Sequence, residues 1–237
     1  MSHNKKRNIG IIYELLLRHM SNCIVENKKY DLKKVTKIIE KRFAKHTELY
    51  KEFRLFNALA KSNISSPDVG NRILFEAKRV STADGGTIYM MTDDNRLKFE
   101  IMTTDSLKIH YGGTSSESIP KNIYPVKLYN PKTNNPNYNN VSAYAALTGE
   151  TVNVKDAYKE KGFDFSGTKG FDEKHGYHSK SLLTVPMKNH EDKIIGVLQI
   201  LNAQDPKTGN IVPFSTSVKM IESLASQAAV AITNKLL

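Results

Sequence analysis

Residues 179–201 read Ser-Lys-Ser-Leu-Leu-Thr-Val-Pro-Met-Lys-Asn-His-Glu-Asp-Lys-Ile-Ile-Gly-Val-Leu-Gln-Ile-Leu. Two segments of this stretch, Leu182–Met187 and Ile194–Leu201, are rich in β-branched and aliphatic side chains, which is typical of strands. Asn189–Lys193 between them has the composition of a tight turn, so the stretch predicts a β-hairpin. The second segment is apolar at almost every position, which indicates a strand in the middle of a sheet with both faces covered.

The sequence before this hairpin predicts further antiparallel strands. Thr87–Met91 and Leu97–Met102 are strand-like, and Asp93–Asn95 supplies the turn of a second hairpin. Leu107–Tyr111 predicts a third short strand in this part of the chain. Hairpins pair their strands antiparallel, whereas parallel strands need long crossovers. We therefore predict an α+β domain over residues 66–237, with a sheet of about six strands.

Helices are expected around the sheet. Pro67 lies near the first position of an amphipathic helix whose apolar stripe ends before Gly85. A second amphipathic helix begins near Ser215, and both are expected on one face of the sheet. Val141–Leu147 predicts a short helix ended by Gly149.

Two other segments are expected to be irregular. Residues 114–140 contain four prolines and seven asparagines, and residues 160–180 are rich in glycine. Loops this long in a compact domain are usually lids or binding loops. The aromatic side chains of the second segment either close the open face of the sheet as a lid or line a small-molecule pocket.

Residues 1–65 differ in charge from the rest of the chain. They hold 15 Lys and Arg against 6 Asp and Glu, and the whole chain carries a formal net charge of +11. Apolar side chains recur at helical spacing in three segments here, which predicts a small helical bundle. One interpretation is weak, salt-dependent contact with nucleic acid, or contact with a protein. The other is a solvated, lysine-rich face.

The composition limits the class of protein. A chain of 237 residues with 39% hydrophobic and 25% charged residues is ordinary for a soluble globular protein. No apolar run approaches the roughly 20 residues that cross a bilayer, and the basic start lacks the pattern of a secretory signal. The single cysteine, Cys23, excludes an internal disulfide and favours a reducing compartment. We expect a cytoplasmic location.

Several segments beyond residue 66 resemble one known family. They are Ile73–Arg79, Ala83–Tyr89, Asn140–Glu150, Asp156–Tyr158, Phe163–Gly167, Ile195–Ala203 and Ser226–Ala231. Together they resemble a GAF domain, and Asn140–Glu150 is similar to its pocket helix. The nearest resemblance is to sensory GAF domains of bacterial cyclic-nucleotide cyclases and HD-type phosphohydrolases.

The resemblance implies an antiparallel sheet with flanking helices, a noncatalytic sensory role and a homodimer formed through the terminal helices. It also implies a ligand, either a cyclic nucleotide or another small molecule. GAF domains of cyclic-nucleotide-regulated phosphodiesterases carry an Asn-Lys…Phe…Asp-Glu signature. Asn202 and Phe214 are present here, but Ala203 replaces the lysine, and Val218 and Lys219 replace the acidic pair. The internal Lys–Asp pair of those domains cannot form in this chain.

We expect the ligand between the sheet and the two irregular segments, because the apolar central strands need a cover there. Aromatic rings would stack on the ligand, and short polar side chains would orient it. The candidate ligand-binding residues are Tyr144, Asp156, Phe163, Phe165, Asp172, Tyr177, Ser179 and Ser181.

The sequence predicts neither catalytic nor metal-binding residues. It has no phosphate loop, dinucleotide fingerprint or nucleophile elbow. Asp172, His175 and His178 lack the further matched ligands that a closed metal site needs.

A second class of function also fits the sequence. Residues 1–65 faintly resemble structural proteins of tailed phages. The chain would then be a phage-derived assembly or scaffold protein, located in the host cytoplasm or the virion, whose GAF fold serves as an interaction surface.

Overall fold

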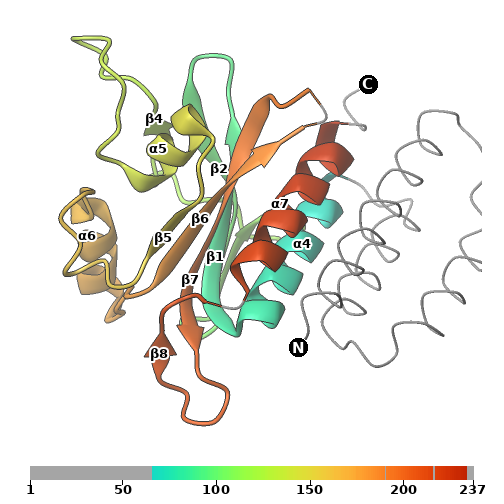
Figure 1. Cartoon of the computed structure of the whole chain (residues 1–237), viewed down its shortest axis with the longest axis vertical. Helices are drawn as coiled ribbons and strands as arrows, with labels where there is room; N and C mark the ends of the chain where they lie inside the picture. The colour runs from blue at the N-terminus through green and yellow to red at the C-terminus, as the bar shows by residue number, and fades with distance from the viewer. Residues whose placement is uncertain (1–65, 190, 216, 234–237) are drawn as a thin grey trace, which may run out of the picture. The chain divides into compact units, whose positions relative to one another are not determined.

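A computed structural model describes residues 66–189, 191–215 and 217–233 of the chain. These residues form one sheet with helices on both of its faces (Figure 1). The predicted bundle over residues 1–65 lies outside this part, and the domain boundary at residue 65 stays a prediction. The helices and strands are α4 (Ser66–Ser81), β1 (Ala83–Met91), β2 (Arg96–Thr104), β3 (Ile109–Gly112), β4 (Val126–Lys127), α5 (Val141–Thr148), β5 (Val152–Val154), α6 (Ser166–His175), β6 (Leu182–Lys188), β7 (Ile194–Gln204), β8 (Ile211–Val212) and α7 (Val218–Thr233).

The sheet is antiparallel, as the two predicted hairpins require. Its strands follow the order β3-β2-β1-β7-β6-β5, while β4 pairs with β2 and β8 pairs with β7. In the β6–β7 hairpin, Leu182 pairs with Leu201 and Val185 with Leu198. The apolar strand β7 therefore lies in the middle of the sheet, as its composition predicts.

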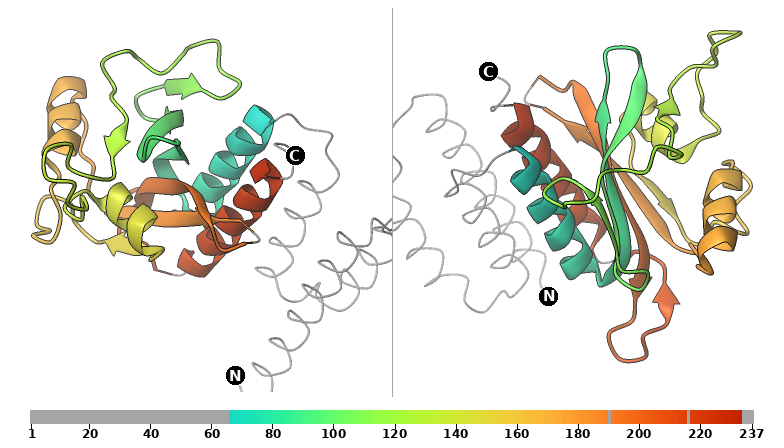
Figure 2. Two further views of the ribbon diagram at one scale, coloured as in Figure 1. Left: turned by 90° about the horizontal axis from the view of Figure 1, so that it is seen from above. Right: turned by 180° about the vertical axis from the view of Figure 1, so that it is seen from behind.

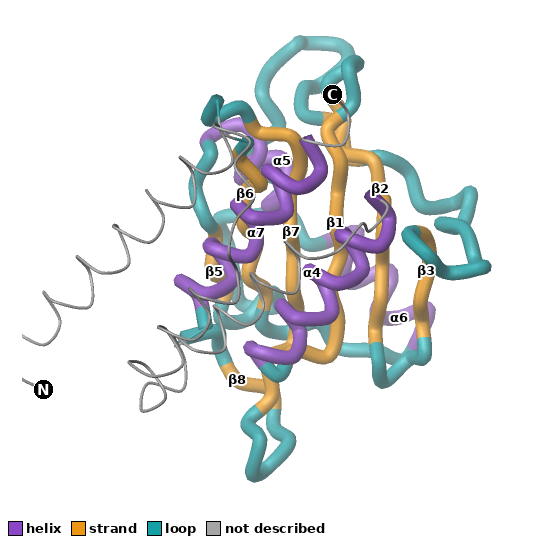
Figure 3. Tube along the Cα trace, turned by 90° about the vertical axis from the view of Figure 1, so that its right-hand side faces the viewer, coloured by secondary structure: helices purple, strands orange, loops and turns teal. Residues whose placement is uncertain are grey.

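The two terminal helices of the domain, α4 and α7, pack side by side on one face of the sheet (Figures 2 and 3). Ile73 and Leu74 of α4 and Ile221 and Leu224 of α7 are fully or almost fully buried. Burial of side chains of this size stabilises a fold by about 1.5–3 kcal/mol each. The predicted packing of the first and last helices on one face is confirmed.

The opposite face is covered by α5, α6 and the loop around β4 (Figures 1 and 2). Asn140 caps α5, because its Oδ1 accepts the N–H groups of Ser142 and Ala143 at 3.0 Å each. Gly149 ends α5 with φ 71°, a left-handed conformation that glycine adopts without steric cost. The predicted helix and its end at Gly149 are confirmed.

The expectation that residues 160–180 are irregular is wrong for residues 166–175, which form α6. The backbone N–H of Ser166 donates to Asp164 Oδ1 at 2.8 Å, and Gly176 ends the helix with φ 61°. Two interior glycines lower the helix propensity of this segment, which explains why its composition indicates a loop. Contacts with the rest of the domain stabilise the helix instead.

The long segment of residues 114–140 is mostly loop, as predicted, but it also contains β4 and a β-bridge between Tyr129 and Pro136. β4 extends the sheet beside β2. Across the described ranges, none of the helices has both the length and the apolar character that a membrane span requires.

Gly196 in β7 gives a test of the packing between the two central strands. A Cβ at this position would lie 2.2 Å from the carbonyl oxygen of Tyr89 in β1. We predict that Gly196→Ala lowers the free energy of unfolding by about 2 kcal/mol or more, because the strands must move apart. Gly170→Ala in α6, where a Cβ meets nothing within 4 Å, is the matched control and should be neutral or stabilising. Equal stability of the two variants in urea unfolding would contradict this account of the β1–β7 contact.

Candidate small-ligand site

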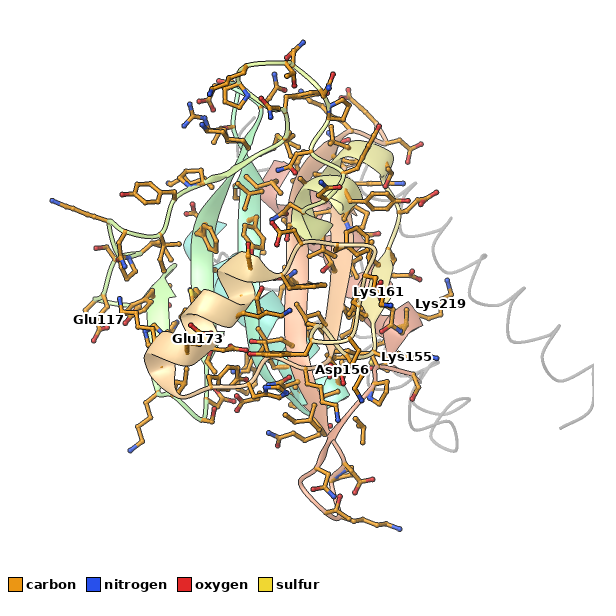
Figure 4. The ribbon with its side chains drawn as sticks, turned by 90° about the vertical axis from the view of Figure 1, so that its left-hand side faces the viewer. Glu117, Lys155, Asp156, Lys161, Glu173 and Lys219 are labelled. Atoms are coloured by element: carbon orange, nitrogen blue, oxygen red, sulfur yellow. The ribbon has the colours of Figure 1, made fainter. Side chains whose placement is uncertain are left out.

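A cavity of about 640 Å³ lies on the face of the sheet opposite α4 and α7. Strands β1, β2, β3, β6 and β7 supply its floor, and the start of α5, one side of α6 and residues 120–126 supply its walls. Figure 4 shows α6 lying across the sheet, between the loop that carries Glu117 and the segment that carries Asp156. Small-molecule sites typically occupy about 300–1,000 Å³, so this cavity has the size of a ligand site.

A neutral hydrogen-bond network lies on the floor of the cavity. Gln199 of β7 donates from Nε2 to Thr184 Oγ1 at 2.9 Å and to Ser142 Oγ at 3.3 Å. The hydroxyl of Tyr89 donates to Gln199 Oε1 at 3.3 Å. Burial raises the pKa of Tyr89 to about 12, so the phenol keeps its proton at neutral pH. The strand residues that line the cavity include no histidine, cysteine or charged residue.

Aromatic rings surround this floor. The rings of Tyr89 and Phe99 lie side by side, with their centroids 4.6 Å apart. Phe165 and Phe171 line the cavity from the side of α6, and Tyr124 lines it from the loop before β4. Tyr124 is 78% exposed, which places its ring at the open side of the cavity. Rings around a neutral polar floor suit a flat, ring-bearing ligand.

One side of α6 borders the cavity through residues spaced three and four apart, namely Gly167, Gly170, Phe171 and Lys174. A Cβ at Gly167 or Gly170 would meet nothing within 4 Å, so the two glycines leave space that larger side chains would fill. Among the described residues that line the cavity, the charged ones are on this side, namely Lys174 of α6 and Asp164 just before the helix, and His175 lies next to Lys174.

Hydrogen bonds to one carboxylate hold α6 on the domain. Asp172 is 1% exposed and is the only residue of α6 that is buried. Its Oδ2 accepts the hydroxyl of Tyr158 at 2.8 Å and the backbone N–H of Ser179 at 2.7 Å, and its Oδ1 accepts Ser179 Oγ at 2.9 Å. The bond to Asp172 raises the pKa of Tyr158 to about 12. Asp172 is therefore the polar anchor of α6, while Phe165, the residue just before the helix, packs in the apolar core.

Three of the eight candidate residues, Phe165, Tyr177 and Ser179, line the cavity. Phe165 also packs against Val141 and Leu182 in a buried apolar cluster, so its ring belongs to the core as well as to the wall. Their part in binding a ligand stays a prediction.

Tyr144 and Phe163 lie beside the cavity rather than on its surface. Their ring centroids are 5.4 Å apart in an edge-to-face arrangement, and Phe163 in turn lies 6.5 Å from Phe165. The hydroxyl of Tyr144 donates to Glu150 Oε2 at 2.8 Å, which raises the pKa of the tyrosine. In this structure the two rings support the wall from outside.

The remaining candidates, Asp156, Asp172 and Ser181, also lie off the cavity surface and have partners within the protein. Asp156 Oδ1 accepts the N–H of Tyr158 at 3.0 Å, in the turn after β5. The hydroxyl of Ser181, fully buried, accepts the N–H of Ala203 at 3.2 Å. Asp172 is the anchor of α6 described above. Direct contact of these three with a ligand stays a prediction.

Asn202 lies near the end of β7 and belongs to the Asn-Lys…Phe…Asp-Glu signature. It forms hydrogen bonds with the segment that follows α6. It is 2% exposed and has φ 55°, a conformation that asparagine tolerates better than most residues. Its Oδ1 accepts the N–H of Lys180 at 2.7 Å, and its Nδ2 donates to Tyr177 Oη and to the carbonyl of His178. Asn202 thus has a structural role in a chain that carries Ala203 in place of the signature lysine.

The candidate list missed the floor of the cavity, including Thr87, Tyr89, Ser142 and Gln199. One feature of the sequence does indicate a polar floor. Gln199 is a polar residue inside the apolar strand β7, and a buried polar side chain needs hydrogen-bond partners. Thr87 and Tyr89 are two residues apart in β1, so the alternation of a strand places them on one face.

The fold and the cavity define a sheet domain of the small-ligand-binding class, and comparison with known proteins gives its family. The family model for the GAF domain matches residues 68–232, and the chain therefore belongs to the GAF family. GAF domains are regulatory modules that bind small ligands. The predicted family and fold are confirmed.

Curated relatives match through a small part of their own length. The chain is 28% identical over 160 residues to the cGMP-specific 3',5'-cyclic phosphodiesterase of Drosophila mojavensis, a match that covers 64% of this chain and 13% of that protein. It is 42% identical over 62 residues to the dual 3',5'-cyclic-AMP and -GMP phosphodiesterase 11A of Takifugu rubripes, which covers 26% of this chain and 6% of that protein.

Among solved structures, the GAF domain of an Acinetobacter phosphoenolpyruvate-protein phosphotransferase superposes with a TM-score of 0.55 at 18% identity. The match covers 81% of this chain and 96% of that one. At this level of identity the likeness shows the fold alone.

Phe165→Ala tests whether that ring is part of the core. We predict a loss of about 3–5 kcal/mol in the free energy of unfolding, the usual effect of truncating a buried phenylalanine. Phe163→Ala, which truncates a half-buried ring next to it, should cost clearly less. Urea unfolding of both variants measures the difference, and a Phe165→Ala variant as stable as the original chain would show that the ring is not core.

Proposed function

We propose that this chain is a noncatalytic sensory module that holds a small, ring-bearing ligand in the cavity beneath α6 and reports it through α4 and α7. The observation that carries the proposal is the cavity itself, a volume of about 640 Å³ that the side chains of the sheet and its cover leave unfilled. A concave site of this size, lined mostly by apolar and aromatic residues with a few convergent polar groups, is typical of small-molecule sites.

The distribution of polar groups suggests the chemistry of the ligand. The floor offers neutral donors and acceptors from Tyr89, Gln199 and Ser142, whereas the side of α6 carries charges of both signs, from Lys174 and from Asp164. A fitting ligand has a neutral ring with hydrogen-bonding edges at its inner end and a negative group beside Lys174, away from Asp164. A cyclic nucleotide has these features, and two of the relatives above are cyclic-nucleotide phosphodiesterases by name.

A noncatalytic role is supported by the same floor. General acid–base or nucleophilic catalysis needs a titratable group next to the reacting atoms. The strand residues of the floor supply hydroxyl and amide groups whose hydrogen bonds join one another, and Tyr89 keeps its proton at neutral pH. Such a floor binds and orients a ligand without moving a proton.

We propose that the conformational change caused by ligand binding is transmitted through the terminal helices, α4 and α7. α4 and α7 pack together, and Ala225, Ala228 and Ala229 of α7 are fully buried, so these small residues serve the packing of α7 within the chain. We propose that a second copy of the chain docks on this helix pair in the cytoplasm, and that residues 1–65 contact a protein or nucleic acid partner.

Gly170→Leu tests the position of the site. The new side chain extends from α6 into the cavity, and it should stabilise the helix rather than disturb it, because glycine is a poor helix former. With cyclic AMP and cyclic GMP as probes in titration calorimetry, we predict that the original chain binds at least one and that the variant binds it at least about tenfold more weakly.

Glu173→Leu is the matched control, because Glu173 is exposed on the same helix and does not line the cavity (Figure 4). It should bind like the original chain. Unchanged binding in Gly170→Leu would place the site elsewhere. If neither nucleotide binds the original chain, the cyclic-nucleotide assignment is wrong.

A further inference from the structure

Tyr177 belongs both to the cavity and to a buried polar network. It follows α6 directly, after Gly176, and its ring lines the cavity. Its hydroxyl donates to Asp84 Oδ2 at 2.6 Å and accepts a hydrogen bond from Asn202 Nδ2 at 2.9 Å. Burial and the adjacent Asp84 carboxylate raise the pKa of Tyr177, so the phenol stays protonated and keeps donating. Tyr177 therefore connects the segment after α6 to Asp84.

Asp84, at the start of β1, also forms hydrogen bonds with the turn between β2 and β3. Its side chain accepts the N–H of Ser106 at 3.1 Å and the hydroxyl of Ser106 at 2.7 Å. Its carbonyl oxygen accepts the N–H of Asp105 at 2.9 Å. Asp84 is 8% exposed, so water competes little for these bonds. The position of this turn depends on the hydrogen bonds of Asp84.

The same turn neutralises a buried lysine of α4. Lys78 lies in the last turn of that helix, and its side chain is 9% exposed. Its Nζ donates to Asp105 Oδ1 at 2.5 Å and to Thr103 Oγ1 at 3.4 Å. The side chain of Asp105 is 70% exposed, so the buried stem of Lys78 carries its ammonium group to the surface of the turn, and this ion pair links the end of α4 to Asp105.

These contacts join parts of the chain that are distant in sequence and lie on opposite faces of the sheet. α6 lies on the face away from α4 and α7 (Figure 3). The contacts therefore run around the end of the sheet where β1 begins, from Tyr177 through Asp84 and Asp105 to Lys78.

We propose that this series of hydrogen bonds couples the cavity to α4, with Tyr177 as the residue that senses the position of α6. A regulatory role for this coupling rests on the proposed function, because the signal would be a ligand bound in the cavity under α6. The coupling itself is a property of the ligand-free protein. α6 is a suitable moving part, since Asp172 is the only residue within the helix that is buried.

Tyr177→Phe tests the coupling, because it removes the hydroxyl and keeps the ring in the cavity. The measurement is amide hydrogen exchange of the full, ligand-free chain. We expect exchange to rise about tenfold in residues 105–108 and 78–82, as loss of one hydrogen bond to a charged group would produce. Tyr111→Phe, a tyrosine that also lines the cavity, is the matched control and should leave both segments unchanged.

The reverse direction is tested by Asp105→Asn, which removes the charge that pairs with Lys78. Because coupling between two sites is reciprocal, exchange should also rise in residues 166–177. An effect of Tyr177→Phe that is confined to residues 166–180, or a uniform rise over every strand, would overturn the proposal. No ligand is used, so a negative result here leaves the ligand-binding proposal standing, and absence of binding leaves this coupling measurable.

Discussion

A strand that is apolar on both sides has to be covered on both sides, and β7 is such a strand. Val197, Leu198 and Ile200 are fully buried at the middle of the sheet. The two covers differ in kind. α4 and α7 bury aliphatic side chains against one face, whereas α6 on the other face buries a single residue, the carboxylate of Asp172. One side of the domain is therefore closely packed, and the other contains the cavity.

The imperfect second cover is what creates the site. α5 packs closely over Tyr89 and Val197, but the cavity side of α6 includes two glycines, Gly167 and Gly170, beside Thr168, Phe171, Lys174 and His175. A hydrogen-bonded anchor holds such a helix in a defined position while leaving volume beneath it, which apolar packing would remove. Because Asp172 is the only buried residue within α6, whereas α4 and α7 bury several aliphatic side chains, we expect α6 to be displaced more easily than those two helices.

The sequence predicted the elements that depend on local pattern. The two hairpins, the first and last helices, and α5 with its end at Gly149 follow from composition, period and turn residues. α6 could not be predicted in this way, because its glycines indicate a loop and the bonds to Asp172 come from residues outside the helix. The candidate site residues were predicted because they cluster along the chain. Three of them line the cavity, and the other five lie behind or beside its walls. The floor was missed, because Thr87, Ser142 and Gln199 come together only when β1, α5 and β7 are assembled.

The central claim is that a small molecule occupies the space between the sheet and α6. The most direct measurement is amide hydrogen exchange of the purified chain before and after addition of the low-molecular-weight fraction of a cell extract. The account predicts slower exchange in α6 and in residues 120–126, the two walls that a ligand would hold together. Exchange that is unchanged in both segments would contradict it.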